Sequence, residues 1–87
     1  MAATQSDVWE TTDLTTVAYL RAIDIRYEEM RAENGEVIWS FVRCPELTEA
    51  IAQYSMGEAS VEPEEFSRQL LKLRRRMFDV LDGRASA

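Results

Sequence analysis

Carboxylates are the most numerous side chains in this chain that could do chemistry. The 87 residues include 16 Asp and Glu, 10 Lys and Arg, and no histidine. A pair such as Glu28 with Glu46 could share acid/base work or hold a cation. A simpler interpretation is that these glutamates favour helix N-termini or face water from strands. The absence of histidine removes the commonest general base and the commonest metal ligand.

The single thiol, Cys44, has no histidine beside it to act as an activating base. It precedes Pro45, so it is expected at a helix N-terminus, where the dipole can favour a thiolate. A small, half-buried apolar residue is the simpler interpretation. Three glycines are too few for a phosphate-binding loop. We therefore expect no enzyme activity, no catalytic residue, no metal and no cofactor.

A basic run, "KLRRRMF", lies in the last third of the chain. On a helix, three cations of this run would share a face with one earlier arginine, opposite the side that carries most of the apolar residues, whereas Arg74 would lie beside that apolar side. These candidate nucleic-acid-binding residues are Arg68, Lys72, Arg75 and Arg76. A solvated helix face explains the run most simply, and phosphate contacts are the functional interpretation. The net charge of −6 argues against the chain as a whole being an electrostatic nucleic-acid binder. A nucleic-acid-associated regulator is therefore the alternative function.

Surplus apolar residues provide the second functional signal. Several large apolar side chains fall outside the faces that the core needs, and the N-terminal segment adds Trp9. Exposed apolar patches on small domains usually mark a partner surface. The candidate protein-interface residues are Leu71, Phe78, Met30, Ile38 and Val42. The leading hypothesis is a small non-catalytic interaction module that binds a protein partner or a second copy of itself.

Three stretches carry the signals of helices. The first begins after Asp13, a good N-cap residue, and spans about ten residues. The second begins at Pro45, and Gly57 is expected to end it, because Gly suits the position just after a helix. The third runs from Pro63 to Gly83. Its apolar stripe comprises Phe66, Leu70, Leu73, Met77, Val80 and Leu81.

Residues 24–32 and 36–42 are predicted to form a β-hairpin around Asn34-Gly35, because Asn and Gly adopt positive φ at little cost. A two-residue turn would place Met30 opposite Trp39. A three-residue turn with a bulge at the glycine would instead gather the aromatic residues of the ribbon on one face, and we favour it for that reason. The predicted core face is then Ile25, Tyr27, Val37, Trp39 and Phe41. The other face holds Met30, Ile38 and Val42.

The expected fold is α+β: a short N-terminal helix, a two-stranded antiparallel β-hairpin and then two helices (α-β-β-α-α), packed on one face of the hairpin. Residues 11–82 are expected to form a single compact domain, with a flexible arm at 1–10 and a frayed tail at 83–87. No apolar run approaches the length needed to span a membrane, so we expect no membrane partner. A single cysteine fits a cytoplasmic setting.

Four stretches carry a resemblance to known proteins: "DLTTVAYLRA", "VIWSFV", "CPELTEAIAQYSMGE" and "VEPEEFSRQLLKLRRRMF". Over about residues 12–81 the chain resembles a family of short bacterial and phage-encoded proteins described only as a domain of unknown function. That family usually has Asp where this chain has Cys44. The shared residues are caps, turns and core positions. The resemblance therefore implies the fold and a phage or mobile-element setting, and it implies no catalytic residue. In such a setting, the interaction module is expected to be an accessory or inhibitor protein.

Overall fold

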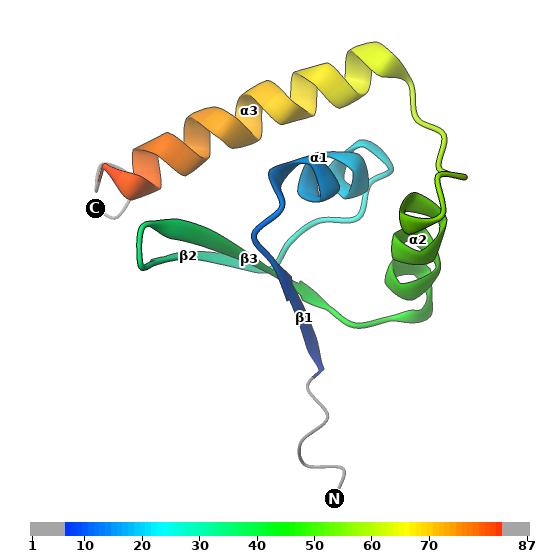
Figure 1. Ribbon diagram of the computed structural model, residues 1–87, viewed down its shortest axis with the longest axis horizontal. Coiled ribbons are helices and arrows are strands. Elements are labelled where there is room, and N and C mark those ends of the chain that lie inside the picture. The colour runs from blue at the N-terminus through cyan, green and yellow to red at the C-terminus, as the bar shows by residue number, and fades with distance from the viewer. Residues whose placement is uncertain (1–6, 83–87) are drawn as a thin grey trace, which may run out of the picture.

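The computed structural model describes residues 7–82 as an α+β domain with a three-stranded antiparallel sheet and three helices (Figure 1). The predicted α+β class is confirmed. Residues 1–6 and 83–87, which include most of the predicted arm and the whole predicted tail, lie outside the described residues. The elements are β1 (Val8–Thr11), α1 (Leu14–Ala22), β2 (Glu29–Glu33), β3 (Glu36–Val42), α2 (Pro45–Ser55) and α3 (Pro63–Leu81).

The sheet has one strand more than the two-stranded hairpin predicted from the sequence. Its strand order is β1-β3-β2, so β3 is the central strand. Three of the four residues of β1 lie in the segment 1–10 that we expected to be an arm. It pairs antiparallel with β3, placing Trp9 opposite Phe41, and the two ring centroids are 5.7 Å apart. The element order is therefore β-α-β-β-α-α. The missed strand is only four residues long, and it pairs with β3.

The hairpin register also differs from the one we favoured. Asn34 and Gly35 have φ angles of 54° and 80°, which are the left-handed values of a two-residue type I′ turn. Met30 pairs with Trp39 and Ala32 pairs with Val37. The three-residue turn was favoured because it aligned the aromatic residues of both strands. That alignment is unnecessary, since Tyr27 reaches the core from the loop before β2 and contacts Trp39 from there.

The register fixes which residues of the hairpin face the helices. Val37, Trp39 and Phe41 are buried, as predicted. Met30 lies on this same face, partly buried against the core, and not on the opposite face as we expected. It is therefore a core-packing residue rather than part of an exposed patch. The other face of β3 carries the half-buried Ile38 and Val42, whose exposed fraction is 51%.

Capping hydrogen bonds and backbone angles explain where α1 begins and where α1 and α2 end. Asp13 caps α1 by accepting hydrogen bonds from the backbone nitrogen of Thr15 and from the hydroxyl groups of Thr15 and Thr16. Both helices close with a Schellman pattern, in which the residue after the C-cap has positive φ. That residue is Gly57 after α2, with φ of 73°, and Asp24 after α1, with φ of 72°. Gly57 therefore ends α2 as predicted.

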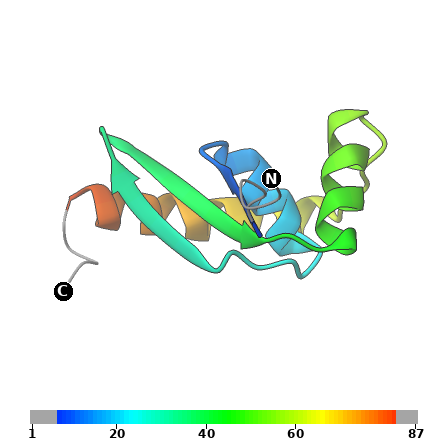
Figure 2. The same cartoon turned by 90° about the horizontal axis from the view of Figure 1, so that it is seen from below.

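Helix α1 is the centre of the core, and α3 lies across it on the same side of the sheet (Figure 1). Val17, Ala18 and Leu20 of α1 have no exposed surface, and Leu73 of α3 is only 4% exposed. Figure 2 shows α2 standing at one end of the sheet. The long α3 thus covers α1 with one face and presents its other face outward.

The sheet face that points away from the helices carries a polar network. Glu10 Oε2 accepts hydrogen bonds from Arg31 Nη1 at 2.8 Å and from Ser40 Oγ at 3.0 Å, and Arg31 Nη2 donates to Glu10 Oε1 at 3.3 Å. The hydrogen bond from Arg31 is the main reason why the pKa of Glu10 is lowered. This network joins β1 to β2 across β3, so it holds the short strand in the sheet.

Candidate anion-binding groove and outer face of helix α3

A groove of about 320 Å³ lies between α1, α3 and the loop that leads into β2. Arg21 comes from the last turn of α1, and Tyr27 comes from the loop. Helix α3 supplies the remaining residues, which are Gln69, Lys72, Leu73, Arg75, Arg76 and Asp79. We call this the basic groove. Four of its eight lining residues are cations, and Asp79 is its single carboxylate.

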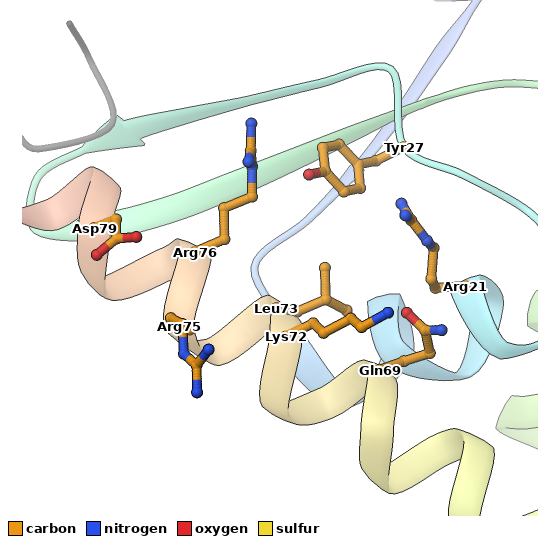
Figure 3. Close-up of a pocket in the computed structure, with 8 residues that line it drawn as sticks. All are labelled: Arg21, Tyr27, Gln69, Lys72, Leu73, Arg75, Arg76 and Asp79. Atoms are coloured by element: carbon orange, nitrogen blue, oxygen red, sulfur yellow. The ribbon is translucent and has the colours of Figure 1, made fainter.

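Figure 3 shows how the groove residues are arranged. In this view the ring of Tyr27 lies between the side chains of Arg21 and Arg76, and Arg75 extends away from Tyr27. The buried side chain of Leu73 forms the apolar base. The ring of Tyr27 also contacts Trp39 edge-on, so its position is fixed by the core. The groove therefore presents positively charged donors and one phenol around an apolar base.

The cations of the basic groove have no acidic partner within residues 7–82, where ion pairs involve only Arg26, Arg31 and Arg68. The chain as a whole has more acidic than basic residues. Acidic side chains are therefore numerous, but Asp79 alone of those described lines the groove, which has a net positive charge. With four cations and one carboxylate, the groove is suited to binding an anion.

Arg68 does not join the other three predicted nucleic-acid-binding residues. It forms an ion pair with Glu65, one turn earlier on α3, and it lines a different surface hollow. Glu65 also accepts a hydrogen bond from Gln69 at 2.6 Å. The structure thus brings Lys72, Arg75 and Arg76 together and leaves Arg68 apart.

Sequence reasoning missed Arg21 and Tyr27. Arg21 is a lone cation in a helix with no other basic residue, and Tyr27 was assigned to a strand in the core. Neither carries a local signal that points to α3. They reach the groove only because α1 packs against α3, and this contact connects residues about fifty positions apart.

The outward surface of α3 is the second candidate site. Leu71 is 62% exposed, Phe78 is 53% exposed and Leu81 is 39% exposed. Together with Ser67 and Arg74, these residues follow the spacing of alternate three and four positions that defines one side of a helix. We call them the outer face of α3. Leu71 and Phe78 therefore lie outside the core, as the helical period predicted, whereas Leu81 is more exposed than the predicted core stripe implied.

Other candidate chemistry finds little support among the described residues. No group of three or more Cys, Asp or Glu side chains in residues 7–82 could hold a metal ion. Cys44 precedes α2 at the N-cap position, half-buried, and its side chain makes no capping hydrogen bond. Within the same part of the chain, no helix combines the length and the apolar character needed to cross a membrane.

Comparison with known proteins places the chain in a family. The sequence profile of the Domain of unknown function (DUF5659) family matches residues 6–79, which is most of the chain. The chain belongs to the DUF5659 family. The match covers every strand and helix of the fold except the last residues of α3, and it extends the predicted resemblance towards the N-terminus to include β1. No curated protein and no solved structure matches. The DUF5659 match names no activity, so the phage or mobile-element setting stays a prediction.

Proposed function

We propose that this DUF5659 protein is a non-catalytic interaction module that binds a protein partner through the outer face of α3. The observation that carries this proposal is the exposure of Leu71 and Phe78, at 62% and 53%, on the most strongly amphipathic helix of the domain. The opposite side of the same helix already packs against α1 and the sheet. More than half of the surface of each of these two apolar residues is therefore left uncovered by residues 7–82.

The spacing of the outer face indicates what kind of partner fits. Leu71 and Phe78 are seven residues apart, which is the repeat at which one helix presents side chains to another helix along a shared seam. Fully burying a Leu or Phe side chain contributes about 1.5–3 kcal/mol each. We therefore propose that the partner presents an apolar helix. A second copy of α3 is one such helix.

The surrounding charges favour a protein surface over a lipid surface. Arg74 lies between the two apolar residues, and Asp79 and Asp82 lie beside Phe78. Arginine and large aromatic residues are enriched in protein interfaces, and mixed charges around an apolar centre resemble the polar rim of such an interface. Carboxylates beside the apolar residues would oppose contact with an anionic membrane.

Site-specific photo-crosslinking tests this proposal in the cells that make the protein. A photoreactive phenylalanine analogue is placed at Leu71 or at Phe78, and the matched control carries it at Gln53, an exposed position of α2. The proposal predicts a discrete protein adduct from both α3 positions and none from the control. An absence of protein adducts at both α3 positions, including the dimer of the chain itself, would contradict it.

A further inference from the structure

We propose that the basic groove binds the phosphate groups of a ligand, through Arg21, Lys72, Arg76 and the hydroxyl of Tyr27. This inference goes beyond protein binding by the outer face of α3 and does not rest on it. Arg75 and Asp79 line both the groove and a hollow beside Leu71 and Phe78 of the outer face, but Arg21, Lys72 and Arg76 do not line that hollow. The two sites can therefore be altered separately.

The arginines of the described residues differ in whether a carboxylate pairs with them. Arg26, Arg31 and Arg68 each have a carboxylate partner in the described part of the chain. The other five described arginines have none there, and three of these five, Arg21, Arg75 and Arg76, line the groove together with Lys72. Gathering unpaired cations from α1 and α3 at one place is unfavourable, because like charges repel. A bound anion would remove this repulsion.

The hydrogen-bond donors of the groove come from separate elements and converge on one place. Lys72 and Arg76 are one helical turn apart on α3, which separates them by about 6 Å along the axis. Arg21 approaches from α1, and Tyr27 lies between Arg21 and Arg76 (Figure 3). A phosphate group offers several acceptor oxygens at once, and guanidinium groups match it with paired donors. Donors converging from separate elements therefore suit a phosphate better than a single carboxylate.

The base of the groove affects how strongly the cations attract a bound anion. Leu73 is buried beneath the cations, and Tyr27 is held against Trp39 by an edge contact with ring centroids 4.9 Å apart. This apolar surface reduces screening by water on the inner side of the groove, while Lys72 and Arg76 stay exposed to water on the outer side. The phosphates could belong to a free polyphosphate compound, such as a nucleotide, or to a nucleic-acid strand. Both sources share the same chemistry, and binding measurements separate them.

Two probes test the inference on the full chain. Inorganic tripolyphosphate is titrated by calorimetry, and a labelled single-stranded oligothymidylate is titrated by fluorescence anisotropy, both at about 50 mM salt. We expect at least one probe to bind. The double variant Lys72→Gln with Arg76→Gln should lower the affinity about tenfold or more, because it removes two charge-assisted contacts. Arg21→Gln should weaken the same binding, and its contribution would show that α1 takes part.

Arg68→Gln is the matched control, because Arg68 lies on α3 but is paired with Glu65 outside the groove. It should leave the affinity within about twofold. Binding of tripolyphosphate alone would assign the groove to a free polyphosphate compound. Tighter binding of the oligonucleotide, with a salt slope of about −2.1 for phosphate contacts from the three cations, would assign it to a strand.

Three results would overturn the inference. The first is no binding of either probe at this salt concentration. The second is an Arg68→Gln variant that loses as much affinity as the groove variants, because general surface charge would then explain the binding. The third is tighter binding of polyglutamate than of either phosphate probe, which would make the ligand an acidic peptide. Urea unfolding of every variant, compared with the wild type, separates lost binding from lost folding.

Discussion

The ring of Tyr27 meets the ring of Trp39 edge-on, with centroids 4.9 Å apart and planes at 78°. Trp39 is fully buried on the central strand, and Tyr27 borders the basic groove. The most buried part of the domain therefore positions one wall of the candidate binding site. Because of this contact, a change at Trp39 should affect both the stability of the fold and the shape of the groove.

Replacing Trp39 with alanine should lower the free energy of unfolding by about 3–5 kcal/mol, because it removes the largest fully buried side chain and leaves a cavity. The total free energy of unfolding of a small domain is about 5–15 kcal/mol, so this loss is a large share of it. Urea unfolding followed by circular dichroism measures the loss. Val42→Ala, at an exposed position of the same strand, is the control and should lose less than about 1 kcal/mol. Equal losses in the two variants would mean that the assigned core face is incorrect.

Replacing Asp24 with glycine should raise the free energy of unfolding by about 0.5–1 kcal/mol, because Asp24 has a left-handed φ of 72° that favours glycine. Its pairing with Arg26 is long and exposed, so little is lost with it. The opposite change at the equivalent position of α2, Gly57→Ala, should lower the free energy by about 1 kcal/mol. An alanine Cβ there would meet no atom within 4 Å, so only the backbone conformation would matter. The thermal unfolding midpoints of the two variants should shift in opposite directions relative to the wild type. Shifts in the same direction would contradict this explanation of the helix ends.

The N-cap of α1 should make stability depend on pH. The pKa of Asp13 is lowered chiefly by the hydrogen bond from the Thr16 hydroxyl, with further hydrogen bonds from Thr15, while partial burial opposes the shift. A folded-state pKa below the unfolded value of about 3.9 means that the charged cap stabilises the fold above that pH. This contribution is lost as the pH falls through the lowered pKa.

Asp13→Asn isolates the effect, because the amide can still accept a hydrogen bond but does not titrate. The wild type should exceed this variant in free energy of unfolding at neutral pH, and the difference should shrink under acid conditions. Comparing the two proteins cancels the separate acid sensitivity of Glu10, whose pKa is also lowered. Urea titrations at neutral and acid pH provide the measurement. A difference that does not change with pH would show that the charge of Asp13 has no part in the cap.

The elements with complete local signals were predictable from the sequence. Helix α3 begins at Pro63, as predicted, and its apolar stripe follows the helical period, because one side of the helix must pack against the core. The turn at Asn34-Gly35 was predictable for a similar reason, since positive φ selects these residues. Gly57 likewise marked the end of α2. In each case the physical cause lies within a few residues of its effect.

The features that were missed depend on contacts between distant segments. The pairing of Met30 with Trp39 depends on how Tyr27 enters the core, which a two-strand pattern does not reveal. Val8–Thr11 becomes a strand only through its pairing with β3. Arg21 joins the basic groove only because α1 packs against α3. The outer face could therefore be recognised largely from the sequence of α3, whereas the remaining residues of the basic groove required the tertiary structure.

The outer face of α3 is proposed to bind a protein partner. The most direct test places a crosslinker next to the residues that are changed. The photoreactive phenylalanine analogue is placed at Ser67, an exposed position on the outer face, in chains with and without Leu71→Glu and Phe78→Glu. We predict that the double substitution abolishes the protein adduct and leaves the free energy of unfolding within about 1 kcal/mol of the wild type. An adduct of undiminished yield, or a double variant that no longer folds, would contradict the claim.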